Sequence, residues 1–137
     1  MICYVLDACA LIALLRNEPG ADKVATVINF ANNDEAEIVM HRINLLEVFY
    51  DVYRSLGREK ATLILTEIVK RPITINAEIT DEIFVEAGRL KATYKVSLAD
   101  SIALAQALAM GGSLLTADHH EFDAIAGHED IDFQWIR

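Results

Sequence analysis

The segment from Leu98 to Met110 predicts a helix that is apolar on nearly every side, with Asp100 in its first turn. A helix that is apolar all round is buried, so other elements must pack on each of its faces. Burying the Asp100 carboxylate costs several kcal/mol or more unless a hydrogen bond or a positive charge compensates it. The fold must therefore enclose this helix and also supply a partner for this carboxylate.

Short apolar runs rich in strand formers alternate with longer segments of helical periodicity along the rest of the chain. We expect strands at 2–6, 36–40, 73–75, 113–116 and 133–136, and helices at 8–16, 21–31, 42–55, 58–70, 81–94 and 98–110. The stretch 118–123 is expected to be a polar loop. Alternation of strands with helices longer than about ten residues predicts an α/β fold with a parallel sheet.

The length of 137 residues suits a single domain spanning 1–137, and no linker or repeat divides it. Apolar residues make up 53% of the chain, as in globular proteins. No apolar run reaches the roughly 18 residues of a membrane span, and the N-terminus lacks the basic region of a signal peptide. Cys3 and Cys9 are too few for a disulfide framework, so we expect reduced thiols in the cytoplasm and no membrane association.

The net charge of −9 argues against a protein that binds nucleic acid through a generally basic surface. It does not exclude an enzyme that gathers carboxylates around metal ions, because bound cations reverse the local charge. The alternative is that the excess of acidic residues only keeps the surface soluble.

Four carboxylates occupy positions that a parallel sheet would bring to one edge. Asp7 follows the first predicted strand and Asp118 follows the fourth, while Asp100 lies in the first turn of a helix. Glu47 lies one to two turns into the helix that follows the second strand. Ligands of parallel α/β sheets bind beyond the carboxyl ends of the strands, so these four side chains are candidates for one shared site.

Each of these carboxylates also has a purely structural interpretation. Asp7 suits a helix N-cap, Asp118 suits a turn, and Asp100 forms a capping-box pattern with Ser97. Glu47 could face solvent. If the four converge they repel one another, and the physical remedy is a hard divalent cation such as Mg²⁺ or Mn²⁺. Such ions activate water for attack on a phosphodiester, which points to hydrolysis of a phosphodiester bond.

The segments 2–12, 43–48, 97–101 and 114–118, which carry these four carboxylates, together resemble the PIN domain. Within that family the chain is most similar to the VapC-type toxins of prokaryotic toxin–antitoxin pairs. The resemblance covers nearly the whole chain, and the motifs occur in the family's order. It implies a three-layer α/β/α fold with a central parallel sheet of four to five strands.

The resemblance also implies a function and its residues. The chain would be a Mg²⁺- or Mn²⁺-dependent endoribonuclease, the toxin of a type II toxin–antitoxin pair, and it would form a homodimer and bind a cognate antitoxin. The family's acidic quartet matches Asp7, Glu47, Asp100 and Asp118 as catalytic residues. Asp7, Asp100 and Asp118 would ligate the metal, and Glu47 would ligate it or position the water. Thr116 would donate a hydrogen bond to a carboxylate or to the water.

Two departures from the family pattern and two alternatives stay open. Cys9 stands where the family usually has Ser or Thr, and Asp123 could replace Asp118 in the site. The chain could instead be a non-catalytic PIN-like binding module, or an inert subunit whose partner binds DNA. Basic residues could guide RNA to the site or could simply be solvated; they are Arg42, Arg54, Arg58, Arg89, Lys91 and Lys95.

Overall fold

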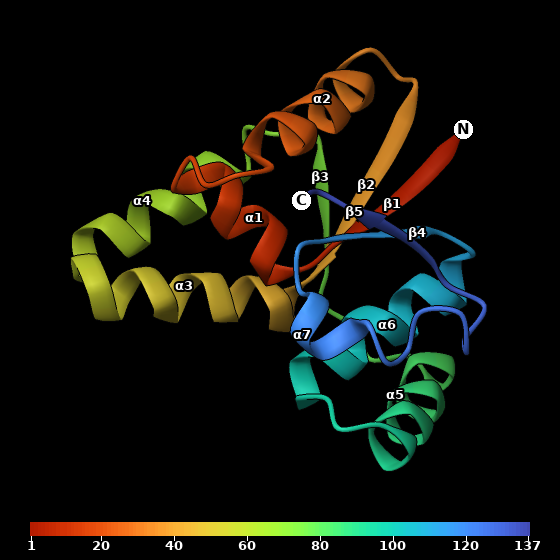
Figure 1. Cartoon of the computed structure of the whole chain (residues 1–137). Coiled ribbons are helices and arrows are strands. Elements are labelled where there is room, and N and C mark those ends of the chain that lie inside the picture. The colour runs from red at the N-terminus through yellow and green to blue at the C-terminus, as the bar shows by residue number, and fades with distance from the viewer.

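A computed structural model describes all 137 residues, Met1–Arg137, as five strands and seven helices (Figure 1). Their order along the chain is β1 (Ile2–Leu6), α1 (Ala8–Leu15), α2 (Ala21–Asn32), β2 (Ala36–His41), α3 (Arg42–Leu56), α4 (Arg58–Ile68), β3 (Ile73–Asn76), α5 (Asp81–Thr93), α6 (Leu98–Met110), β4 (Ser113–Thr116), α7 (His119–Phe122) and β5 (Asp132–Trp135).

The strands form one sheet in which every neighbouring pair is parallel, in the order β3-β2-β1-β4-β5. The predicted α/β fold is therefore confirmed, with five strands in the sheet. The chain builds the sheet outward from β1 to β3 and then returns to place β4 on the other side of β1. This reversal makes the gap between β1 and β4 a topological switch point, the usual place for a ligand in such sheets.

The sheet lies between two layers of helices, which the alternation of side chains along β1 explains. Val5 packs into a core formed with α5 and α6, whereas Leu6 packs into a core formed with α1 and α2. Leu114 and Leu115 of β4 divide between the same two cores. In Figure 1, α1 and α2 lie on one side of the sheet and α5 and α6 on the other, while α3 and α4 form a pair that extends beyond them.

Helix α6 is the buried helix that its composition predicts. Every residue from Ser101 to Ala107 is buried, and the helix packs against α3, α5 and three strands of the sheet. Its ends differ from the expectation, because Leu98 is 62% exposed and Met110 is 40% exposed. The two ends project beyond the layers that cover the middle of the helix.

Replacing Leu104 by Ala is expected to lower the free energy of unfolding by about 3 kcal/mol, because its side chain is fully buried and the remaining cavity cannot collapse completely. Denaturant unfolding measures this change. The matched control is Leu98→Ala on the same helix, which should cost less than about 0.5 kcal/mol because Leu98 is exposed. Equal losses in the two variants would contradict the burial described for α6.

Side-chain caps define where several helices begin. Thr80 and Ser97 accept hydrogen bonds from the backbone N–H groups of Ile83 and Asp100, at the starts of α5 and α6. The expected polar loop at 118–123 is wrong for its middle, where α7 forms a single turn. Four residues are too few to show helical periodicity in a sequence. No helix is both long enough and apolar enough to cross a membrane.

Candidate active site

A cavity of about 400 Å³ lies among residues that follow β1 and β4, next to the switch point of the sheet. Glu47, Asp100 and Asp118 line it, so three of the four predicted site residues meet although they are far apart in the sequence. Three further acidic residues also line the cavity, namely Glu18, Asp51 and Glu121. Six carboxylates around one cavity are a strong concentration of negative charge.

Asp7 lies beside these residues but is only 1% exposed. Its Oδ1 accepts a hydrogen bond of 2.8 Å from the backbone N–H of Ala10, so it caps α1. Its Oδ2 accepts a hydrogen bond from the hydroxyl of Thr116, which in turn accepts one from the backbone N–H of Asp118 at 3.0 Å. Thr116 therefore connects the carboxylate that follows β1 to the backbone that follows β4.

Burial raises the pKa of Asp7 from 3.8 to about 7, although the hydrogen bonds from Thr116 and Ala10 oppose this change. The charges of Asp100 and Asp118 raise the same pKa further. Asp7 is thus buried and also lies within the electrostatic reach of the acids that line the cavity.

Burial likewise raises the pKa of Asp100 to about 6. A hydrogen bond from the Ser97 side chain to the carboxylate opposes this shift, whereas the charges of Glu47, Asp118 and Glu121 add to it. The cap at the start of α6 therefore only partly compensates this carboxylate. The half-buried Asp100 needs a further positive partner to be ionised at low cost.

Glu47 carries a buried carboxylate oxygen that the protein itself does not satisfy. Burial raises its pKa, with Asn44 opposing the change and the charge of Asp118 adding to it. Its Oε1 atom is buried and accepts no hydrogen bond. A buried acceptor without a donor is costly, and a cation or a donor from a ligand would remove that cost.

The donor set of the cavity fits a hard divalent cation. Carboxylate oxygens are the ligands that Mg²⁺ and Mn²⁺ prefer, and Glu47 Oε1 is free to act as one. As the side chains stand, no three His, Cys, Asp or Glu residues are close enough to enclose a metal ion. Binding a cation would therefore require these carboxylates to draw together.

Asp118 and Asp123 are the two candidates for the fourth acid of the site, and the structure places them differently. Asp118 lines the cavity, and its Oδ1 caps α7 by accepting the N–H of Glu121 at 3.1 Å. Asp123 is exposed and lies 2.8 Å from Nδ1 of His119, away from the lining residues. Glu121 was not expected in the site. Its spacing of three from Asp118 is that of a capping box, and this pattern places it at the cavity edge.

Cys9 lines the cavity where the resemblance predicts a hydroxyl side chain. Burial and the charge of Asp7 raise its pKa to about 11, with the backbone of Ala117 opposing the change. The group is therefore a neutral thiol near pH 7 and adds no charge to the site.

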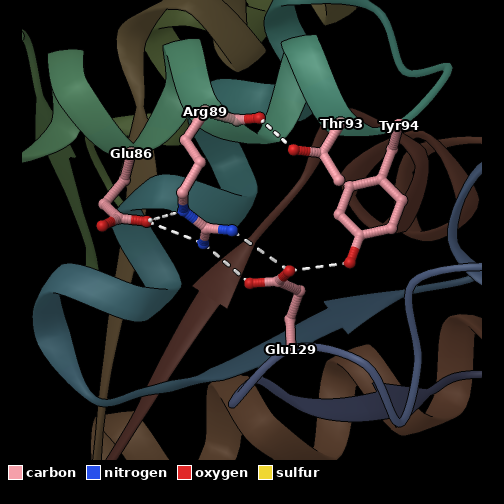
Figure 2. Close-up of polar contacts among 5 residues, drawn as sticks. All are labelled: Glu86, Arg89, Thr93, Tyr94 and Glu129. Carbon is pink, nitrogen blue, oxygen red and sulfur yellow. Dashed lines mark hydrogen bonds and ion pairs between the residues drawn. The ribbon is translucent and has the colours of Figure 1, made fainter.

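Two of the basic residues that could guide RNA are held by the protein itself. Figure 2 shows Arg89 between two carboxylates, with Nη2 at 2.8 Å from Glu86 and 2.7 Å from Glu129. The Tyr94 hydroxyl donates to Glu129 at 2.7 Å, which ties α5 to the segment after α7. Lys91 donates to the backbone carbonyl of Val96. These contacts favour a structural role for Arg89 and Lys91.

Comparisons with known proteins agree with this architecture. A sequence model of the PIN domain matches residues 4–128. VapBC-1 from nontypeable Haemophilus influenzae has a TM-score of 0.74 at 20% identity, covering 98% of each chain. A DNA-bound VapBC from Salmonella typhimurium has a TM-score of 0.73 at 17% identity, covering 100% of each chain.

A third solved structure is Mycobacterium tuberculosis VapC20, described as a toxin that cleaves the sarcin–ricin loop. It has a TM-score of 0.65 at 14% identity and covers 94% of this chain and 98% of its own. No curated protein sequence matches the chain. At identities this low, the solved structures establish a shared fold.

Proposed function

Because the chain belongs to the PIN domain family, we propose that it is a Mg²⁺- or Mn²⁺-dependent endoribonuclease and the toxin of a type II toxin–antitoxin pair. The observation that carries this function is the convergence of Glu47, Asp100 and Asp118 on one cavity. These residues come from α3, the start of α6 and the turn between β4 and α7. The fold by itself does not require acidic residues from three distant segments to line one cavity. It also does not require a fourth acidic residue, Asp7, to be buried beside that cavity.

In this function, Asp7, Asp100 and Asp118 hold the metal, and Glu47 either ligates it or orients the attacking water. A bound divalent cation would neutralise the carboxylates, activate water and stabilise the charge that develops on the phosphate. Thr116 keeps Asp7 in place through its hydroxyl and is joined to the backbone of Asp118. The rigid helix α6 holds the Asp100 carboxylate at the cavity.

We also infer two protein partners. Solved structures that resemble this chain include VapBC complexes, which supports a cognate antitoxin as one partner. The α3–α4 pair exposes large apolar side chains that suit such a contact, among them Leu46, Leu56 and Leu63. A second copy of the chain is the other partner, and Phe84 and Val85 of α5, which are 70% and 63% exposed, are candidates for that contact.

Incubating the purified, antitoxin-free protein with a mixed pool of RNA tests the enzymatic activity. Cleavage is expected with Mg²⁺ or Mn²⁺, with 5′-phosphate and 3′-hydroxyl ends, and it should stop when a chelator is added. Cleavage that persists in chelator would contradict the metal-dependent function. No cleavage of any RNA under any of these conditions would favour the alternative of a non-catalytic binding module.

Replacing Asp118 by Asn is expected to lower the cleavage rate at least about 10-fold, because a ligand oxygen beside the cation is lost. Asp123→Asn is the matched control and should cleave close to the wild-type rate, because Asp123 faces His119 and not the cavity. Initial rates on one RNA at saturating Mg²⁺ measure both effects. A larger loss for Asp123→Asn would assign the fourth acid to that residue.

A further inference from the structure

Two side chains of α3 stand at the edge of the acidic cavity without a role in holding a metal. They are Tyr50 and Arg54, and both line the cavity. We propose that they bind one nucleotide of single-stranded RNA beside the carboxylates, with the Tyr50 ring stacked on a base and Arg54 contacting the adjacent phosphate. This role rests on the proposed function and specifies which form of RNA the site accepts.

The helical spacing places both side chains next to the predicted catalytic residue of α3. Tyr50 and Arg54 follow Glu47 by three and seven residues, so the three share one face of the helix. Tyr50 is 47% exposed, so much of its ring is open to a ligand. A base stacked there would lie one helical turn from Glu47.

Arg54 is the only basic residue among those that line the cavity. Its side chain is 75% exposed and donates no hydrogen bond within the protein. Its closest acidic atom is Oδ1 of Asp51 at 3.7 Å, whereas Oδ2 of Asp51 already accepts a 2.7 Å hydrogen bond from Arg16. The guanidinium donors of Arg54 are therefore available to a phosphate.

The two side chains also adjoin each other. The guanidinium carbon of Arg54 lies 5.7 Å from the centre of the Tyr50 ring, within cation–π range. Arg54 therefore covers one face of the Tyr50 ring, and a base would stack on the opposite face. An aromatic ring with a basic group beside it is a common way for proteins to hold a nucleotide of a single strand.

The charge of the cavity explains why such a pair is needed. The six carboxylates of the cavity repel the phosphates of RNA. The positively charged side chain of Arg54 at the edge gives the strand one favourable point of approach. Base stacking adds affinity that does not depend on charge. Bases inside a duplex are stacked on one another and cannot reach Tyr50, so the pair selects unpaired RNA.

Binding of a labelled oligoribonucleotide, measured by fluorescence anisotropy in Mg²⁺, tests this role. All proteins carry Asp100→Asn so that cleavage does not interfere. Tyr50→Leu is expected to weaken binding of the single strand about 10-fold, and Tyr50→Phe to bind like the reference because the ring remains. Tyr53→Leu is the matched control, since Tyr53 is 46% exposed on the same helix but does not line the cavity.

The salt dependence of binding tests Arg54 separately. Arg54→Gln should reduce the slope of log Kd against log salt concentration by about 0.7, the value for one phosphate contact on a single strand. Arg42→Gln is the control, because Arg42 is also an exposed arginine of α3 but lies outside the cavity. The reference protein should also bind the same sequence more weakly as a duplex.

Three results would overturn the role of the pair: equal affinity of Tyr50→Leu and Tyr53→Leu, preference for the duplex, or no binding of RNA by the reference. Cleavage by the wild type, measured in parallel, separates this inference from the proposed function. If the wild type cleaves RNA and Tyr50→Leu binds normally, only the inference fails. If the wild type does not cleave but Tyr50→Leu loses affinity, only the nuclease function fails.

Discussion

Replacing Asp100 by Asn is expected to lower the rate of metal-dependent RNA cleavage at least about 10-fold. Loss of a residue that hydrogen-bonds a metal ligand lowers metal affinity or activity about 10- to 100-fold. Loss of a residue that binds the metal directly should lower the cleavage rate by no less. Asn is nearly the same size as Asp, and the hydrogen bond from the Asp100 backbone N–H to Ser97 is unchanged. The side-chain oxygen of Asn can still accept a hydrogen bond from the Ser97 hydroxyl. The fold should therefore be retained.

The same substitution should raise the melting temperature of the metal-free protein. Burial and the charges of Glu47, Asp118 and Glu121 disfavour the ionised form of Asp100, and Asn removes that charge. A gain in stability together with a loss of activity is the behaviour of a residue kept for function. Thermal unfolding in chelator and cleavage rates in Mg²⁺ measure the two effects on one preparation.

Asp81→Asn is the matched control for this substitution. Asp81 lies in the first turn of α5, which Thr80 caps as Ser97 caps α6. Unlike Asp100, it is exposed and does not line the cavity. It should leave cleavage unchanged. Equal cleavage by Asp100→Asn and the wild type would rule out a catalytic role for Asp100.

The stability of the metal-free protein is expected to fall as the pH rises from about 4.5 to 7. The pKa of Asp7 is about 7 and that of Asp100 about 6, against an ordinary value of 3.8 for both, because burial disfavours their charged forms. In this pH range the folded state binds more protons than the unfolded state, so deprotonation favours unfolding. For Asp7 alone the difference corresponds to at most about 4 kcal/mol.

Carboxylates whose pKa is lowered act in the opposite direction. Glu129 is held ionised by Arg89, and Asp132 by Ser113 and Gln134, so their contributions are lost as the pH falls through the acidic range. The decline caused by Asp7 and Asp100 should therefore be clearest above about pH 4.5. Denaturant unfolding in chelator at a series of pH values measures it.

Adding Mg²⁺ or Mn²⁺ should flatten this pH dependence and raise the melting temperature near neutral pH. A cation bound only by the folded state stabilises it and displaces the protons that Asp7 and Asp100 would otherwise retain. Asp7→Asn is the comparison variant, because Asn is also a good N-cap and can keep the bond to the Ala10 N–H. Its stability should vary less with pH than that of the wild type. A stability that rises from pH 4.5 to 7 in chelator would contradict the raised pKa values.

The elements of the fold were largely predictable because they depend on local chemistry. The strand at 2–6 and the helix at 98–110 match β1 and α6, since apolar runs and their periodicity directly reflect burial. The missed helix α7 has only one turn, and its formation depends on the side chain of Asp118. The other observed boundaries differ from the predicted ones by one or two residues at most, because the ends of helices fray and are not sharply defined.

The sequence by itself predicted that Asp7, Glu47, Asp100 and Asp118 share one site, because acids after predicted strands and at helix starts point to the carboxyl edge of a sheet. Only the tertiary structure decided how they are arranged. The strand order places β4 beside β1, so Asp118 comes near Asp7, and no local pattern encodes this pairing. Burial of Asp7, the unpartnered Oε1 of Glu47 and the addition of Glu121 likewise depend on contacts between distant segments. Asp100 was predicted as a charge that needed a partner, and the fold surrounds it with the further negative charges of Glu47, Asp118 and Glu121. This arrangement is the reason for proposing a cation as that partner.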